Sequence, residues 1–599
     1  MRGSEAVPSD QTAGHRLRCR RAHGLFTFGI SPSWLWRGVT ASLLALPGLT
    51  ASQARTQPPV PASTAVVLPS APASGSAAAR SSTAPLLAGL DAYHFPIESH
   101  DRRVGRYVDQ GMLLVYGFNP EEAARSFEAA LAIDPACASC WWALAWALGP
   151  NINTDISPQT AARVDRAVRE ARRHAPGASP LQRSLIDALA LRHPGGGAID
   201  EAAYAQRLRA LARRHPRSAD VALLAAEALL NLHPYDWWAP GGAPKPWTPE
   251  IETLLERAMT LQPRHPGAHH YWIHLQESSP HPQRALPSAE FLEDAVPGSG
   301  HLLHMPSHIY MRVGRFDAAI RANQRSIEAD RQYLAQVDAQ GAYRVGYVAH
   351  NHHFLWAAAS MAGRQQLALE AAQAAWPAAC GPARRDPGTA IVQQYAVLPY
   401  FTLVRFGQWD TLVRGTPPPD SPDPYPLAIW HYARGTAYAR TGRLDAAQQD
   451  LERLERLAAE PSLAAFKVKN INPTAHLARI AVLTLRADLA LARADPSAAV
   501  ALLREATRIE DALEYDEPHL WLAPTRQALG ATLLAAGLAN QAEQVYREDL
   551  RHYPDNGWSL SGLALALAQQ GHPVPAQKAS ERARAAFHQA ERLPTGSRF

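Results

Sequence analysis

The sequence predicts an all-α fold, a right-handed α-solenoid of stacked helix-turn-helix repeats. Ala and Leu dominate the 599 residues and β-branched residues are sparse, which favours helices over strands. Short apolar segments alternate with breaks at Gly, Pro and Asp-Pro, as expected for many short helices. Small residues, an aromatic residue and a terminal Pro recur at similar offsets over most of the chain, which is typical of a repeat array.

Residues 1–54 have the pattern of an export signal. A basic beginning precedes an apolar run at 38–50 that is too short to span a bilayer, and the small residues at 52–54 form a cleavage pattern. Residues 55–87 are rich in Pro, Ala and Ser and are interpreted as a linker, since such a composition cannot bury a core. No later segment has a transmembrane pattern, so we expect a soluble mature protein, periplasmic or extracellular, without an integral membrane segment. A disordered basic arm is the alternative for 1–54.

The charge of the chain gives no sign of nucleic-acid binding. The formal net charge is +5, from 59 Lys and Arg against 54 Asp and Glu, and the basic excess lies before residue 60. The folded part is therefore expected to be close to neutral, without the basic surface that nucleic acids require.

The four cysteines are too few for a disulfide scaffold in a chain of this length. Cys137 and Cys140 form a C-x-x-C between the first repeat and the next helix. In an exported protein this spacing favours a local disulfide that staples the helix start. In a reducing compartment it would instead suggest redox work or a metal. Cys19 falls in the expected leader, and Cys380 has no evident partner.

The clearest repeat unit spans residues 106–135. Small residues stand where two antiparallel helices would cross closely, an aromatic side chain fills the gap beside them, and a Pro ends the second helix. These landmarks are Gly111, Ala123, Phe127, Ala130 and Pro135. Similar landmarks return around Gly435, Gly530 and Gly571.

These landmarks resemble those of tetratricopeptide repeats (TPR), and the resemblance covers nearly all of residues 100–590. A narrower resemblance is to a group of exported bacterial TPR proteins with the same histidine strings in the same order. It rests on GFNPEEAARSFEAA, ALGPNIN, HLLHMPSHIYMRVGR, EYDEP and YREDLRHYPDNGWSL. The resemblance implies the fold and no particular activity. We divide the folded chain into N-terminal repeats (88–265), histidine-rich central repeats (266–383) and C-terminal repeats with a capping helix (384–599).

The histidines of the central repeats share the period of the repeat. His270 and His274 are four residues apart, as are His304 and His308, and the second pair follows the first by 34 residues, the length of a TPR. Three units that begin near 266, 300 and 349 put these and three more histidines in equivalent slots on one helical face. In TPR solenoids this face lines the concave groove. Seven imidazoles are therefore expected to converge there: His270, His274, His301, His304, His308, His350 and His353.

Seven imidazoles on one face favour a metal site over polar contacts with a peptide. Without a metal, partly charged rings in a dry groove would repel one another and lose hydration. A His-x-x-x-His pair on a helix is itself a chelating spacing. Imidazole suits copper, zinc, iron and nickel. Because zinc uses only three or four ligands, a copper pair with about three histidines each uses the set best, with zinc or iron as alternatives.

Several neighbours are candidates for supporting roles. Glu277, one turn beyond His274, is a candidate catalytic base or hydrogen-bond partner of a ligand, or simply a solvated helix end. Trp237 and Trp238, in an insertion at 234–248, could wall the groove or pack within the repeats. Met305, beside the ligands, is a further candidate for the groove wall. The remaining candidates are the helix-start or carboxylate segment 515–518 and the supporting or surface residues His269, His281 and His352.

The sequence supports three functions. The first is a metal-dependent oxidoreductase, most suitably with copper, whose groove holds a peptide or small organic substrate beside the metal. The second is a non-catalytic adaptor that binds a protein or peptide partner in the groove. The third is a metal storage or delivery protein that uses the same ligands without turnover. The sequence contains no glycine-rich phosphate loop, nucleophile elbow or paired-Asp hydrolase pattern.

Overall fold

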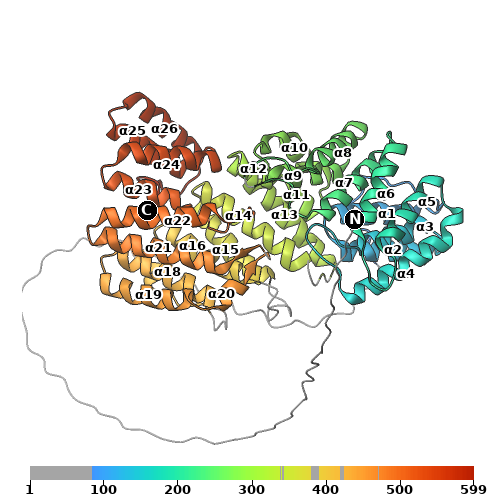
Figure 1. Ribbon diagram of the computed structural model, residues 1–599, viewed down its shortest axis with the longest axis horizontal. Coiled ribbons are helices and arrows are strands. Elements are labelled where there is room, and N and C mark those ends of the chain that lie inside the picture. The colour runs from blue at the N-terminus through green and yellow to red at the C-terminus, as the bar shows by residue number, and fades with distance from the viewer. Residues whose placement is uncertain are drawn as a thin grey trace, which may run out of the picture. The chain divides into compact units, whose positions relative to one another are not determined.

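The computed structural model describes residues 84–599, except 240, 338, 340–342, 380–389, 419–423, 470 and 522. The expected export signal, most of the linker and Cys380 therefore lie outside the described residues. The described residues belong to one compact unit and are almost entirely helical (Figure 1). The predicted all-α class is confirmed. None of the helices in this described part is long and apolar enough to cross a membrane.

Side-chain caps and prolines set the ends of the N-terminal helices. Asn119, Ser157 and Ser218 each accept a hydrogen bond from a backbone N–H in the first turn of the following helix. Pro120 and Pro158 open their helices, where a missing N–H costs nothing. The elements of this region are α1 (Arg102–Tyr116), α2 (Pro120–Ile133), α3 (Ala138–Ala147), α4 (Pro158–His174), η1 (Ala175–Gly177), α5 (Pro180–Arg192), α6 (Glu201–Arg214), α7 (Ala219–Leu232) and α8 (Thr248–Leu261).

The central repeats begin where the sequence register placed them, because helices start at Pro266, Gly300 and Ala349. Pro306 divides the first helix of the second unit into α11 and α12, since proline has no N–H to continue the helical ladder. Met305 nevertheless keeps helical dihedrals, with φ −52° and ψ −36°, so α12 continues the direction of α11. The elements are α9 (Pro266–Glu277), η2 (Pro282–Ala285), α10 (Leu286–Ala295), α11 (Gly300–His304), α12 (Pro306–Arg312), α13 (Phe316–Gln336), the π-helical η3 (Arg344–Val348), α14 (Ala349–Met361) and α15 (Gln365–Ala379).

The C-terminal repeats contain the strands of the described chain, a short antiparallel hairpin. In it Lys467 lies opposite Pro473 and Val468 lies opposite Asn472. The elements are α16 (Ala390–Arg405), α17 (Trp409–Arg414), α18 (Pro424–Arg440), α19 (Leu444–Ala458), α20 (Ser462–Ala465), β1 (Lys467–Val468), β2 (Asn472–Pro473), α21 (Thr474–Ala492), α22 (Pro496–Asp511), α23 (Thr525–Ala535), α24 (Ala539–His552), α25 (Gly557–Gln569) and α26 (Pro573–Ala586).

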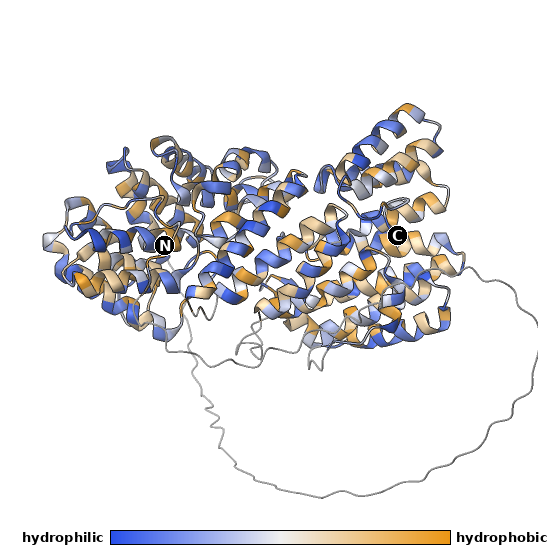
Figure 2. Ribbon diagram, turned by 180° about the vertical axis from the view of Figure 1, so that it is seen from behind, coloured by the Kyte–Doolittle hydropathy of each residue, from blue (hydrophilic) through white to orange (hydrophobic). Residues whose placement is uncertain are grey.

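Neighbouring helices pack as hairpins at the predicted small residues. α1 packs on α2, and α23 packs on α24. A Cβ added at Gly111 would lie 2.4 Å from the ring of Phe127, and one added at Gly530 would lie 2.4 Å from the ring of Tyr546, so both crossings require glycine. Figure 2 shows apolar and polar residues interleaved along the helices, as expected when each helix buries one side. The fold is a solenoid of TPR-like helix hairpins.

Candidate metal centre

The seven predicted ligand histidines lie in the interior of the central repeats. They come from α9, α11, α12 and α14, and none is more than 8% exposed. The sequence predicted an open concave groove, whereas the structure buries these side chains under aromatic rings. Buried imidazoles are costly unless their nitrogens have partners.

Three of the histidines form the first triad: His270, His274 and His301. One ring nitrogen of each lies within 4.8 Å of those of the other two. The Nε2 atoms of His270 and His301 are 3.1 Å apart, and Nε2 of His274 has no hydrogen-bond partner. These three nitrogens are close enough together to bind one metal ion.

Three more histidines form the second triad: His304, His308 and His350. Their ring nitrogens also lie within 4.8 Å of one another. The two triads are neighbours, because the ring centres of His274 and His308 are 5.7 Å apart and those of His301 and His304 are 5.8 Å apart. The structure thus sorts six of the seven expected ligands into two adjacent sets of three.

His353 does not join either triad. Its ring stacks on Trp356 at 5.4 Å and meets the edge of Tyr395 on α16 at 5.5 Å. Its ring centre is 6.5 Å from that of His350, and neither of its nitrogens has a hydrogen-bond partner. The repeat register placed His353 on the same face, but its side chain packs toward the next helix layer.

Glu277 links the two triads. It is the last residue of α9 and is 2% exposed, so it is not the solvated helix end that was one alternative. Its Oε1 accepts a hydrogen bond from the Nδ1–H of His274 at 3.2 Å, and its Oε2 is closely paired with the Nδ1–H of His308. Burial alone would raise the pKa of the Glu277 carboxyl, but His308 and His274 hold that pKa well below its usual range. The group is therefore ionised.

The second triad places two imidazole lone pairs face to face. His304 donates its Nδ1–H to Oδ1 of Asn323 at 2.7 Å, and Asn323 is held in this orientation because its Nδ2 donates to the carbonyl of Ala319 at 2.8 Å. Nδ1 of His308 lies in close ion-pair contact with Oε2 of Glu277. A neutral imidazole has a single N–H, so if both rings carry it on Nδ1, the Nε2 atoms of His304 and His308 present two lone pairs 2.9 Å apart. A cation between them would stabilise that state, whereas a hydrogen on either Nε2 would form an N–H···N hydrogen bond at this distance.

A metal ion suits that position better than a proton does. Burial lowers the pKa of His304 well below its usual value and also lowers that of His308, which disfavours an added proton at neutral pH. Two ligands of a tetrahedral site with metal–nitrogen distances of about 2.0–2.1 Å stand roughly 3.3 Å apart. The Nε2 separations of 2.9 and 3.1 Å are close to this value.

Burial keeps most imidazoles of the centre in the neutral form that binds metals. It is the largest cause of a strongly lowered pKa at five of them, and nearby cationic groups add to it. These five are His270, His301, His304, His350 and His353.

Each triad is covered by one phenylalanine. The ring of Phe118 lies 4.5 to 5.6 Å from the three rings of the first triad, and the ring of Phe354 lies 4.5 to 4.9 Å from those of the second. Sequence reasoning missed both. Phe354 follows His350 by four residues, so helical spacing could have found it. Phe118 comes from the turn between α1 and α2, with a left-handed φ of 52°, and no spacing rule connects it to the histidines.

Hydrogen-bonded side chains from two loops and from the π-helical η3 border the first triad. The hydroxyl of Tyr235 donates to Oδ1 of Asn153 at 2.5 Å, and Nδ2 of Asn153 donates to the hydroxyl of Tyr347 at 3.0 Å. The Tyr347 ring is 4.8 Å from that of His301, and the Tyr235 ring is 6.4 Å from that of His274. These three residues were not predicted, although Tyr235 lies within the insertion at 234–248.

The residues proposed as groove walls have packing roles. Trp237 is fully buried beside Tyr235, and Trp238 donates its Nε1–H to the carbonyl of Leu275, which braces α9. Met305 is buried at the junction of α11 and α12. His269 points away from the triads, toward Ser288 and the carbonyl of Pro263, while His281 is exposed and His352 is half-buried.

The segment 515–518 does not start a helix, because α23 begins at Thr525. Asp516 and Glu517 are buried, and Asp516 accepts a hydrogen bond from Nζ of Lys469 at 2.6 Å. Burial raises the pKa of Glu517 to about 8, and the charge of Glu277 contributes to that rise. The charge of Glu277, beside the histidine triads, therefore acts on this pair of carboxylates.

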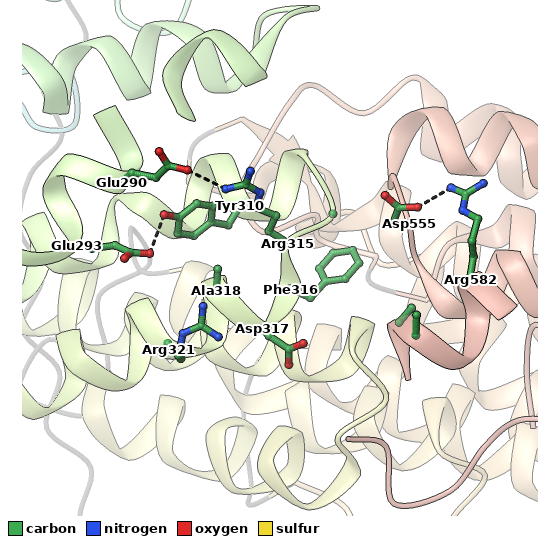
Figure 3. A pocket seen from close by; sticks show the side chains of 13 residues that line it. Glu290, Glu293, Tyr310, Arg315, Phe316, Asp317, Ala318, Arg321, Asp555 and Arg582 are labelled. Carbon is green, nitrogen blue, oxygen red and sulfur yellow. Dashed lines mark hydrogen bonds and ion pairs between the residues drawn. The ribbon is translucent and has the colours of Figure 1, made fainter. Parts of the chain in front are cut away.

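A cavity of about 530 Å³ lies apart from the triads, between α10, α12, α13, the α24–α25 turn and α26 (Figure 3). Most of the charged groups on its wall pair with one another. Arg315 contacts Glu290 at 3.0 Å, and Arg582 contacts Asp555 at 2.5 Å (Figure 3). The cavity contains none of the triad histidines.

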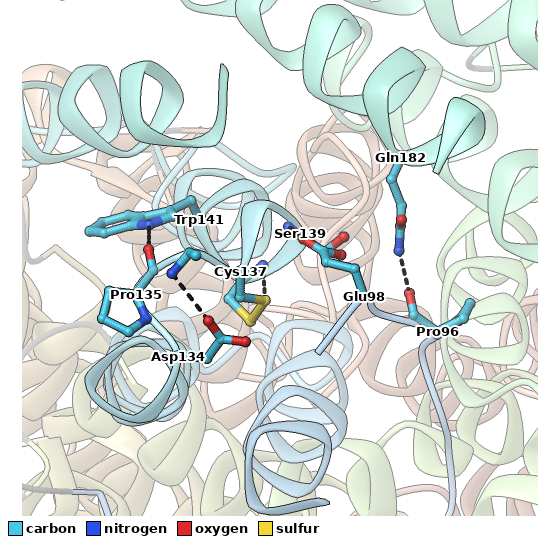
Figure 4. Close-up of a disulfide and its surroundings, with 10 residues drawn as sticks. Pro96, Glu98, Asp134, Pro135, Cys137, Ser139, Trp141 and Gln182 are labelled. Carbon is cyan, nitrogen blue, oxygen red and sulfur yellow. Dashed lines mark hydrogen bonds between the residues drawn. A yellow bond between two sulfur atoms is a disulfide. The ribbon is translucent and has the colours of Figure 1, made fainter. Parts of the chain in front are cut away.

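Cys137 and Cys140 are joined by a disulfide at the start of α3, with an S–S distance of 2.00 Å (Figure 4). Nearby polar groups reinforce the same helix start. Oε1 of Glu98 accepts a hydrogen bond from the backbone N–H of Ser139 at 2.8 Å, and Nε1–H of Trp141 donates to the carbonyl of Pro135 at 3.0 Å (Figure 4). The disulfide therefore belongs to a local staple of the first repeat.

The known structures that match this chain share only a distant likeness with it. No family model and no curated protein matches the sequence. Among solved structures, a human IFIT1 dimer with PPP-AAAA aligns with 12% identity and a TM-score of 0.30, over 80% of this chain and 90% of that one. The P58(IPK) TPR domain aligns with 13% identity and a TM-score of 0.22, over 82% and 99%. The Cut9–Hcn1 hetero-tetramer of the APC/C aligns with 12% identity and a TM-score of 0.23, over 82% and 94%.

These identities and TM-scores are too low to assign a class of protein, so the class is defined by the packing and the site of the chain itself. Fold and site define it as an all-α, TPR-like solenoid whose central repeats bury two adjacent histidine triads joined by one carboxylate.

Proposed function

We propose that this protein is an exported metalloprotein that binds two transition-metal ions, one in each triad, and acts as an oxidoreductase on a peptide or small organic substrate. One observation supports the metal most directly: the Nε2 atoms of His304 and His308 face each other at 2.9 Å, while Nδ1 of His304 donates to Asn323 and Nδ1 of His308 contacts Glu277. A cation between the two Nε2 atoms would stabilise two lone pairs at that distance.

Copper is the metal that we favour. Each triad offers three imidazole nitrogens and no thiolate, and both oxygens of Glu277 are engaged by Nδ1–H groups. Three histidines with an open position would also suit a zinc ion, and iron remains a second alternative. A pair of copper ions would supply one-electron and dioxygen chemistry.

The residues of the chain would shape that chemistry. Glu277 and Asn323 hold three imidazoles with their Nε2 atoms free to bind metal. Phe118 and Phe354 keep water from the triads. The Tyr235–Asn153–Tyr347 chain of hydrogen bonds borders the first triad, and it would restrict the size of any substrate that approaches there.

The burial of the histidines separates this proposal from the adaptor alternative. A peptide partner would contact exposed side chains, but each triad histidine is at most 8% exposed. An adaptor would therefore have to use other surfaces of the solenoid. Metal storage or delivery would use the same six ligands, and only turnover distinguishes it from catalysis.

Metal analysis of the purified protein tests the proposal. After reconstitution we expect two ions per chain, and clearly substoichiometric copper, zinc and iron would refute it. His350→Ala should lose the ion of the second triad, whereas His352→Ala, a half-buried neighbour on the same helix, should keep both. Oxygen consumption with candidate phenols, thiols or peptides then separates an oxidoreductase from a storage protein.

A further inference from the structure

Glu277 contacts one histidine of each triad. Its two carboxylate oxygens face different triads: Oε1 accepts a hydrogen bond from His274 of the first triad, and Oε2 is in close ion-pair contact with Nδ1 of His308 of the second. The carboxylate is 2% exposed, so solvent does not supply a substitute acceptor. The two rings lie on different helices, α9 and α12, with their centres 5.7 Å apart.

The position of one proton decides whether an imidazole can bind a metal. A neutral ring with its hydrogen on Nδ1 offers the lone pair of Nε2 to the metal, whereas a ring with its hydrogen on Nε2 does not. The acceptor beside Nδ1 therefore selects the ligating tautomer. For His304 that acceptor is Asn323. For His274 and His308 it is the same residue, Glu277.

We propose that Glu277 is a positioning residue that prepares one histidine of each triad to bind metal. This inference rests on the proposed function, since it assumes that the triads bind metal. A carboxylate can do this because it has two acceptor oxygens and no hydrogen of its own to donate. It holds one ligand of each triad in the metal-binding tautomer, and losing either oxygen disables one triad.

The substitution Glu277→Gln isolates this role because it preserves shape and burial. An amide has one acceptor oxygen and one NH₂ donor. The oxygen can receive the Nδ1–H of one histidine, but the NH₂ group then faces Nδ1 of the other. That ring must accept, its hydrogen moves to Nε2, and it can no longer bind a metal. We expect the stoichiometry to fall from two ions per chain to one.

The experiment loads the full chain with copper and, separately, with zinc, and counts the ions bound. The wild type should bind two, Glu277→Gln one, and the control Glu256→Gln two, since Glu256 is an exposed acid on the neighbouring helix α8. Glu277→Asp, which keeps both oxygens, should retain more of the second ion than Glu277→Gln. Two ions bound to Glu277→Gln with wild-type affinity would overturn the inference and leave the proposed function intact.

A measurement on the metal-free chain tests Glu277 independently of loading. Nitrogen-15 NMR of histidine-labelled protein distinguishes the two tautomers. In the wild type, His274 and His308 should both carry their hydrogen on Nδ1, and in Glu277→Gln one of them should change. A wild-type chain in which either ring carries its hydrogen on Nε2 overturns the inference, whether or not the variant folds. A wild type that binds no metal refutes the proposed function alone, because the tautomers remain measurable.

Discussion

The two histidine triads are alike in composition but differ in how firmly their ligands are held. In the second triad, Asn323 is hydrogen-bonded to His304, Glu277 is in close ion-pair contact with His308, and the covering Phe354 comes from the same helix as His350. In the first triad, Glu277 fixes His274 alone, while the Nδ1 atoms of His270 and His301 have no hydrogen-bond partner. Ligands with a fixed tautomer bind metals more tightly, so we expect the second triad to hold its ion more firmly and the first to be the adaptable, reactive one.

Removing one histidine of a triad should have the largest effect, because it should leave the two triads with different metal contents. His304→Ala should abolish metal binding at the second triad, because two nitrogens are left where three faced a common point. The first triad keeps its ligands, so about one ion per chain should remain. Metal analysis with His352→Ala as the control measures this, and retention of two ions by His304→Ala would contradict the assignment.

Acid should lower the free energy of unfolding of the metal-free protein through the histidines of both triads. In the unfolded chain the imidazoles take up protons near a pKa of about 6.5, whereas the fold lowers the pKa of the six listed here: His270, His301, His304, His308, His350 and His353. Below pH 6.5 the unfolded state therefore binds more protons. The free energy of unfolding should fall with decreasing pH, by up to about 1.4 kcal/mol per pH unit for each such ring.

Denaturant titrations of the metal-free chain between roughly pH 7.5 and pH 5 measure that slope. A free energy of unfolding that stays constant over this range would contradict the lowered pKa values. Bound metal should move the loss of stability to lower pH, because protons must then displace the ion.

Each phenylalanine cover should protect its own triad. Phe118→Ala and Phe354→Ala should each lower the free energy of unfolding by about 3–5 kcal/mol, the usual cost of deleting a buried phenyl ring. Phe118→Ala should speed the removal of the first ion by a chelator, and Phe354→Ala that of the second. The two variants act as controls for each other, and equal acceleration at both triads would argue against separate covers.

The smallest effect should come from the residue that sets the tautomer of His304. Asn323→Leu should weaken metal binding at the second triad by about 10- to 100-fold, the range typical for partners of metal-bound histidines, and leave the first triad unchanged. Gln324→Leu, an exposed neighbour on α13, is the matched control. Competition with a chromophoric chelator measures the affinity. An unchanged affinity in Asn323→Leu would remove the expected difference between the triads.

The spacing of residues along the chain was sufficient to predict the fold and to predict that most of the clustered histidines lie close together. The repeat register placed three units near Pro266, Gly300 and Ala349, where helices do begin. It worked because each unit is a local hairpin whose small and aromatic residues pack within it. The same register brought six histidines onto neighbouring helices, but it could not show that His353 turns toward Tyr395.

Contacts between distant segments could not be predicted in this way. Phe118, Asn153 and Tyr235 reach the first triad from other parts of the solenoid, and no periodicity relates them to the histidines. Their presence explains why the expected open groove is closed. Glu277 was visible as a neighbour of His274, but its second oxygen serves a ring from another helix, which only the packing of α9 against α12 reveals.

The reach of Phe118 across the solenoid limits how modular this centre can be. A fragment made only of residues 266–383 would carry every ligand but none of the three residues that close the first triad from outside. Its second triad would keep Phe354 as a cover, but its first triad would lose Phe118 and be exposed to water and to other metal ions. The smallest fragment that keeps both triads covered therefore begins at α1. For the same reason, recombination between α1 and α9 would separate ligands from their shield, so these distant repeats should be inherited together.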